Sequence, residues 1–231
     1  MPDSRAVRVL AAALLVLLLA GCMPAYPTPA PGPRWNRHVI AKGNHGATVV
    51  RGATAPAPLL GFTRLSGRTY HLIFDSTARY RITQPTQPDD QFDWNKLPGL
   101  SDCGDVDLSR NGFMFGWRWN LAETPKVLEL TAYANNHGAH LTSDEPLLTL
   151  TRAQVNARRP IWFRLRISND RRSYEFTIRT RLAGEEEVRH DRLPRACPNK
   201  PRSMVKWAGG FYFGGTSVAP QRIQASIFER R

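Results

Sequence analysis

The sequence predicts an all-β fold, a two-sheet antiparallel sandwich of the jelly-roll type, over residues 36–231. Three observations indicate this fold class. This part of the chain has no long helical period and no internal repeat, and its apolar residues alternate in short segments between turn residues. Its length of about 195 residues is large for an immunoglobulin sandwich and suits a jelly roll. We therefore expect one domain over this range.

The clearest element is WFRLRISNDRRSYEFTIRTRL (162–182), which is predicted to form a β-hairpin with SNDRRS as its turn. If Ile167 opposes Tyr174, every inward-facing pair along the two strands is apolar, and this sets the register. The outward-facing pairs that follow are Arg166 with Glu175, Arg164 with Thr177, and Trp162 with Arg179.

This register predicts a basic strip on the outward face of the hairpin. Its arginines are candidate ligand-binding residues for an anion: Arg164, Arg166, Arg179 and Arg181. The alternative is an ordinary solvated sheet face, because an exposed ion pair such as Arg166 with Glu175 stabilises a protein little.

A second strand, GFMFGWRWN (112–120), places Phe113, Phe115, Trp117 and Trp119 on one side. Four aromatic side chains on one face favour a core position over a platform for sugar rings, because each buries about 150–250 Å². The predicted partner is KVLELTAYAN (126–135), whose leucines and alanines alternate with polar residues. The two strands would then share a polar face with these candidate ligand-binding side chains: Arg118, Glu129 and Tyr133.

Three further segments alternate as strands do: RTYHLIFD (68–75), ARYRIT (78–83) and QRIQASIFE (221–229). The stretch between the early strands and the aromatic strand, residues 87–107, is rich in Asp, Pro and Gly. That composition predicts a long ordered loop.

The N-terminal segment, in contrast, has the pattern of an export signal. Its apolar run, Val9 to Leu19, has eleven residues, whereas a membrane-spanning helix needs about 20. Arg5 and Arg8 precede the run, and the small residues Ala20 and Gly21 follow it. This order predicts a cleaved signal over residues 1–21.

The last three residues of the signal and the residue that follows it, LAGC (19–22), resemble the lipobox of bacterial lipoproteins. The resemblance implies that Cys22 becomes the acylated N-terminus and anchors the chain in a lipid bilayer, with an ordinary secretory signal as the alternative. The five prolines within residues 22–35 favour an extended tether of about 3.1 Å per residue. In a Gram-negative cell, Met23 after the cysteine favours the outer membrane over the inner one.

With Cys22 lipidated, Cys103 and Cys197 form an even pair in a compartment that permits disulfides. We expect them to be bonded to each other. Neither has a CxxC partner or a nearby Cys/His pair at zinc-ligand spacing, so no metal site is predicted there.

The formal net charge of +13 falls to +12 when residues 1–21, with two Arg and one Asp, are removed. Because an exported protein does not meet nucleic acid, the expected polyanions are acidic polysaccharide, lipid phosphates and peptidoglycan. The alternative is that the positive charge reflects a GC-rich genome and not a binding function. Such a genome favours Arg codons, and 27 of the 32 basic residues are Arg.

Segments GNHG (43–46), DWNKLPGLSDCG (93–104), FGWRWN (115–120) and YFGGTSVAPQRIQASI (212–227) resemble, in this order, a group of small exported bacterial proteins without assigned function. Such proteins look like concanavalin A-like jelly rolls, the architecture of lectins, glucanases and alginate-lyase-type polysaccharide lyases. This chain has Asp105 and Asp107 where the pattern tends to have histidines.

No segment matches the Glu-x-Asp-x-x-Glu arrangement of retaining glucanases of this architecture. The nearest acidic cluster is Asp102, Asp105 and Asp107. Carboxylates so close in sequence could hold calcium, but a solvated acidic loop is the favoured interpretation, and no cofactor is expected.

A polysaccharide lyase would need a cation and a base. Arg118 and Tyr133 with His137 or His140 supply these residue types. The sequence assigns no catalytic residue, and the two histidines are its candidates. The favoured function is non-catalytic binding of an anionic glycan by a membrane-anchored envelope lipoprotein. The alternatives are a glycan-active enzyme such as a lyase, or a structural lipoprotein that binds another envelope protein.

Overall fold

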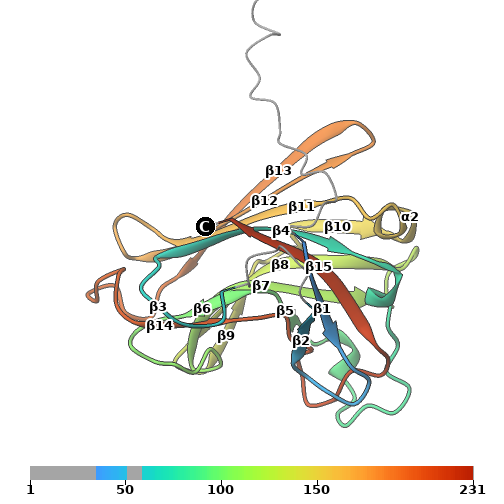
Figure 1. Cartoon of the computed structure of the whole chain (residues 1–231), viewed down its shortest axis with the longest axis horizontal. Coiled ribbons are helices and arrows are strands. Elements are labelled where there is room, and N and C mark those ends of the chain that lie inside the picture. Colours follow the sequence, from blue (N-terminus) through green and yellow to red (C-terminus); the bar gives the residue numbers. More distant parts are fainter. Residues whose placement is uncertain (1–34, 51–58, 231) are drawn as a thin grey trace, which may run out of the picture. The chain divides into compact units, whose positions relative to one another are not determined.

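The computed structural model describes residues 35–50 and 59–230. Two antiparallel sheets pack face to face in a jelly-roll-like sandwich (Figure 1), which confirms the predicted fold class. The predicted signal (1–21), the lipidation residue Cys22 and nearly all of the predicted tether lie outside the described residues.

Sheet A has seven strands in the order β13-β12-β11-β4-β15-β1-β2. Their bounds are β1 Asn36–Ile40, β2 Ala47–Val50, β4 Gly67–Phe74, β11 Ile161–Ile167, β12 Ser173–Leu182, β13 Glu185–Pro194 and β15 Ile223–Arg230.

Sheet B has eight strands, of which six follow the order β10-β8-β7-β6-β14-β3, while β5 pairs with β7 and β9 pairs with β8. Their bounds are β3 Gly61–Thr63, β5 Asn95–Lys96, β6 Gly99–Ser101, β7 Asn111–Asn120, β8 Val127–Asn136, β9 Ala139–Thr142, β10 Leu148–Thr151 and β14 Lys206–Gly209. The helical segments are the short turns η1 Ser76–Ala78 and η2 Asp90–Phe92 and the helix α2 Arg152–Asn156.

The predicted hairpin is confirmed with its register. Ile167 opposes Tyr174, and all six residue pairs from there to Trp162 with Arg179 match the prediction. The register is strongly specified because a shift of one residue would turn Phe163 and Leu165, both fully buried, out to solvent.

The core lies between β7 of sheet B and the strands of sheet A. All four aromatic residues of β7 are buried, as predicted. Phe113 stacks on Tyr174 of β12 with ring centroids 4.4 Å apart. Phe115 makes edge contacts with Phe163 and Phe176 at 4.9 and 5.2 Å. These contacts cross the interface between the sheets, so β7 sets how sheet B packs on sheet A.

The guanidinium of a buried ion pair in sheet A also joins the two sheets. Arg68 of β4 pairs with Glu229 of β15, with Nε and Oε1 2.6 Å apart. The same guanidinium donates to two carbonyl oxygens of sheet B, at Gly99 (2.9 Å) and Gly209 (2.5 Å). Its donors are thus distributed over both sheets, and a buried charge needs such partners.

Two sequence-based predictions were wrong. ARYRIT (78–83) forms no strand, because Tyr80 turns its ring into the core against Trp117 and the Ile82 amide donates to the Gln91 side chain. The predicted loop 87–107 contains η2 and the short strands β5 and β6.

Replacement of Phe115 by Ala is expected to lower the free energy of unfolding by about 3–5 kcal/mol, because it removes two cross-sheet ring contacts and leaves a cavity. Urea unfolding monitored by circular dichroism measures this loss. Phe62→Ala is the control, because Phe62 is 67% exposed, and it should cost less than about 1 kcal/mol. Equal losses would contradict the assigned core.

Candidate functional site

The predicted basic strip lies on the outer face of sheet A. The core residues of β11 and β12 point inward, so Arg164, Arg166 and Arg179 point outward, as their burial shows. They line a shallow depression of about 320 Å³. Arg181, two residues after Arg179 in β12, is exposed and does not line the depression.

Strand β13 completes the depression with three residues that the sequence did not predict, His190, Asp191 and Arg192. His190 opposes Thr177 and Arg192 opposes Glu175 in the register of β12 and β13. The sequence EEEVRHDRLP of this edge strand lacks the apolar alternation that marks a strand, because most of its residues contact no core.

Positive charge exceeds negative charge in the depression. Four arginines line it against two acidic residues, Glu175 and Asp191. Glu175 accepts from Arg166 at 2.6 Å and from Arg192 at 2.5 Å. Burial alone would raise the pKa of Glu175, but these two hydrogen bonds outweigh it and hold that pKa below its usual range.

Arg164 lies in the middle of the depression, between Trp162 and Arg166 along β11. Its side chain is exposed and has no hydrogen bond or ion pair with the residues that the structure describes. Next to it, the Arg179 guanidinium lies over the Trp162 ring, 4.9 Å from the centroid. The depression therefore presents a guanidinium without a partner in the described part of the chain, beside an aromatic ring and a Thr177–His190 hydrogen bond of 3.0 Å.

The other predicted polar face, on the outside of sheet B, divides into two parts. Arg118 and Glu129 pair with each other, with Nε and Oε2 2.7 Å apart. The Arg118 guanidinium also donates to the Phe92 carbonyl at 2.9 Å and lies 4.1 Å from the Trp94 ring centroid. These two residues hold the segment 92–94 over the sheet.

Gly116 of β7 makes this close approach possible. A Cβ atom at that position would lie 2.9 Å from Cγ2 of Thr131 and 3.3 Å from the Trp94 side chain. The absence of a side chain at residue 116 therefore lets Trp94 lie close against the outer face of sheet B.

Tyr133 belongs to the second part, a groove of about 740 Å³ on the same face. We name it the sheet B groove. Its floor contains Met114 of β7 with Tyr133 and Asn135 of β8, and Lys96 of β5 stands at its side. The remaining lining residues are Asp93, Leu97, His140 of β9 and residues from segments 106–109 and 207–216.

Lys96, Asp93 and Tyr133 influence one another in the groove. The Lys96 ammonium lies 4.6 Å from the Tyr133 ring centroid and donates to the Trp94 carbonyl. Burial lowers the pKa of Lys96 to about 8, against the effect of the Asp93 carboxylate. Burial and Asp93 together raise the pKa of Tyr133 to about 12. Burial also raises the pKa of Asp93, although Lys96 opposes this.

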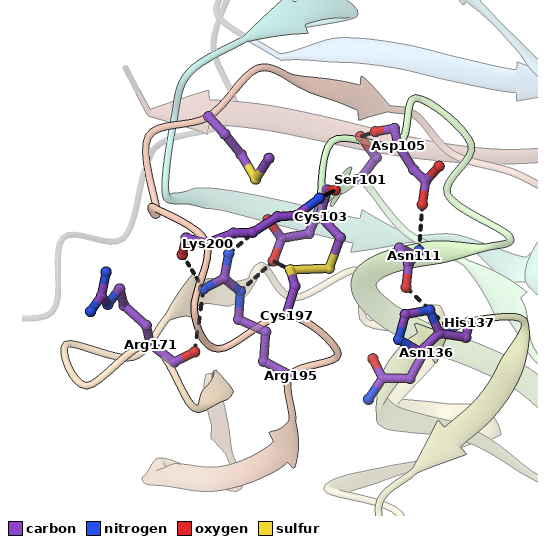
Figure 2. The surroundings of a disulfide bond; sticks show 12 residues. Ser101, Cys103, Asp105, Asn111, Asn136, His137, Arg171, Arg195, Cys197 and Lys200 are labelled. Carbon is purple, nitrogen blue, oxygen red and sulfur yellow. Dashed lines mark hydrogen bonds and ion pairs between the residues drawn. A yellow bond between two sulfur atoms is a disulfide. The ribbon is translucent and has the colours of Figure 1, made fainter.

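The two candidate histidines lie in different places. His140 lines the groove, with its ring centroid 5.7 Å from that of Tyr133. His137 has a positive φ of 54° in the turn between β8 and β9, is exposed, and does not line the groove. Its amide donates to Asn111 Oδ1 at 3.0 Å, a contact drawn in Figure 2.

A glycine pair brings segment 213–217 close to Asp93. A Cβ atom at Gly215, where φ is +77°, would lie 2.4 Å from Oδ2 of Asp93. A Cβ atom at Gly214 would lie 2.2 Å from the Trp94 carbonyl oxygen. Asp90 fixes the same segment, because its carboxylate accepts from Thr216 Oγ1 at 2.7 Å and from the Ser217 hydroxyl.

The predicted disulfide is confirmed: Cys103 and Cys197 are bonded, with their Cα atoms 5.6 Å apart. Beside it, Asp102 pairs with Arg195 at 2.5 Å, and both side chains are fully buried. Tyr174 donates to Asp102 at 3.1 Å and Lys206 Nζ lies 3.9 Å away. Figure 2 shows Arg195 next to the disulfide, facing backbone carbonyls.

The three aspartates that were considered for calcium have separate protein partners. Asp102 belongs to the buried network just described. Asp105 accepts from the Asn111 amide, and Asp107 accepts from Ser109 Oγ at 2.7 Å. Among the residues described, these three carboxylates do not form one metal-ligand group.

No protein-family model matches this chain, and a search of curated proteins finds no match. In residues 35–50 and 59–230, no helix has the length and apolar character needed to cross a bilayer. The geometry of the depression and of the groove therefore supplies the evidence on function.

Replacement of Cys103 and Cys197 by Ser is expected to lower the free energy of unfolding by about 4–5 kcal/mol, because the bond closes a loop with a sequence separation of 94. Guanidinium unfolding measures the loss. A reductant should destabilise the parent protein by a similar amount and leave the double variant unchanged. A parent protein insensitive to reductant would contradict the predicted contribution.

Proposed function

We propose that this protein binds an acidic glycan on the basic outer face of β11, β12 and β13, without catalysing a reaction there. The observation that supports this function best is the Arg164 guanidinium, which has no partner among the described residues and lies in a depression where arginines outnumber acidic residues by four to two. Guanidinium groups form strong, charge-assisted hydrogen bonds with carboxylate and sulfate oxygens.

The arrangement of these side chains suits a polymer. Outward residues on one strand are about 6.8 Å apart, so Trp162, Arg164 and Arg166 form a line along β11. Arg192 and Arg179 extend the positive charge across the neighbouring strands. A chain of sugars with repeated negative charges can contact several of these groups together, while the Trp162 ring supplies an apolar surface.

The side chains of the depression favour binding over catalysis. Its carboxylate Glu175 is held by two arginines, and its imidazole His190 is bonded to Thr177. Neither is arranged as a free base. In the sheet B groove, the raised pKa of Tyr133 leaves the phenol protonated at neutral pH, so it is a poor base for a lyase reaction.

We further propose that the chain is a lipoprotein of the cell envelope, anchored through acylated Cys22 in a bilayer that is the outer membrane in a Gram-negative cell. The support is the LAGC sequence at 19–22, the apolar run before it and the proline-rich stretch after it. An anchored basic domain would meet acidic polysaccharide at the cell surface or in the periplasm.

Arg164→Glu is expected to weaken binding of polygalacturonate by about tenfold or more, because it places a carboxylate at the centre of the depression. Isothermal titration calorimetry measures this. Arg222→Glu makes the same change in net charge outside the depression and should leave the affinity within about twofold of the parent.

Added salt provides the second readout. The parent affinity should fall severalfold between about 0.05 and 0.2 M salt, since ions screen contacts with exposed charges. The fall should be smaller for Arg164→Glu. Equal weakening by Arg164→Glu and Arg222→Glu would indicate attraction by net charge alone and would overturn the proposed site.

Cys22→Ser is expected to move the protein from the detergent phase to the aqueous phase of a Triton X-114 partition, because loss of the acylated residue removes the apolar chains. The parent protein expressed in a bacterial host is the reference. Mass spectrometry of its N-terminal peptide should find the lipid on Cys22. A parent protein that stays in the aqueous phase would contradict the anchor.

A further inference from the structure

The sheet B groove contains a buried polar atom to which the described residues supply no partner. Asn135 is 3% exposed and lines the groove from β8. Its Nδ2 atom donates to the Leu108 carbonyl at 2.7 Å, which sets the orientation of the amide. Within the described residues, Asn135 Oδ1 has no hydrogen-bond partner. A buried acceptor left without a donor costs about 1–3 kcal/mol.

The charged groups of the groove favour a neutral ligand over an anionic one. Asp93 and Asp107 line it together with Lys96. Lys96 faces Asp93, whose charge it compensates, and Asp107 is ionised with hydrogen bonds from Ser109. A uronate or phosphate would meet no excess of positive charge here, in contrast to the depression on sheet A.

Exposed aromatic rings at the groove are held in position from behind. Tyr212 is 41% exposed, and its ring stacks on that of His45 with centroids 5.4 Å apart. Trp207 is 36% exposed and contacts the edge of Phe62 at 5.3 Å. Rigid rings with one free surface pack against flat apolar groups at low entropic cost.

We propose that the sheet B groove binds a neutral saccharide. A hydroxyl or amide N–H of the sugar donates to Asn135 Oδ1, while Asp93 and Lys96 bond to ring hydroxyls. The C–H face of a sugar ring packs on Tyr212 and Trp207. The groove volume of about 740 Å³ falls in the range of ligand sites, about 300–1,000 Å³.

This site is independent of the proposed acidic-glycan site. The groove lies on the outer face of sheet B, and the depression lies on the outer face of sheet A. The two faces are separated by the buried core, so one molecule can bind a neutral and an acidic saccharide together.

Saccharide titrations of the full chain test the proposal, with chitotetraose, cellotetraose and tetragalacturonate as probes. At least one of the two neutral tetramers should bind with a Kd below about 1 mM. Tyr212→Ala and Asn135→Ala should each weaken that binding by about tenfold. Phe92→Ala, which removes an exposed ring outside the groove, should leave it unchanged.

Arg164→Glu separates this proposal from the acidic-glycan function, because it should weaken polygalacturonate binding and leave the neutral tetramer unaffected. If Asn135→Ala does not fold, the affinity of Tyr212→Ala for the neutral tetramer tests the proposal instead. The proposal is overturned if neither neutral tetramer binds, if Tyr212→Ala binds as the parent does, or if Tyr212→Ala weakens tetragalacturonate instead.

Discussion

The Asp102 carboxylate is fully buried between Arg195 and Tyr174, and the end of the sandwich depends on this charge. Asp102 directly follows β6 of sheet B, whereas Tyr174 lies in β12 and Arg195 directly follows β13 of sheet A. Removal of one member of a buried pair costs about 3–5 kcal/mol, because the other charge is left uncompensated. The disulfide at Cys103, one residue further, adds a covalent link at the same place.

Both proposed binding surfaces depend on this junction. β12 and β13, which form most of the depression, lead into Arg195 and Cys197. The loop 106–109 and Trp207, which line the groove, flank Cys103 and Lys206. Stability at the junction therefore supports sites on two opposite faces of the sandwich, and rigid scaffolds of this kind hold binding residues in place.

The outer faces of the two sheets differ in how far other segments of the chain cover them. On sheet A, nothing in the described residues covers Arg164, so the basic strip stays in contact with solvent. On sheet B, Trp94 lies against Gly116 and over Arg118, and the Arg118–Glu129 pair supports the segment above it. Arg118 and Glu129, which the sequence predicts to bind a ligand, thus support the segment 92–94. Tyr133, the third residue of that predicted face, lies in the groove.

The sequence by itself determined the sandwich, the hairpin register, the aromatic core face of β7 and the pairing of Cys103 with Cys197. Period-two alternation records which face of a strand is buried, and cross-strand pairing then allows few registers. Only the tertiary structure decided that Arg192 and His190 join the basic strip, and that Asp93, Lys96 and Asn135 meet in one groove. Arg192 and His190 come from an edge strand without apolar alternation, and Lys96 comes from a two-residue strand. Asp93 lies in a loop, and Asn135 lies near the end of β8. Their positions depend on long-range packing, such as Trp94 on Gly116, which no local pattern records.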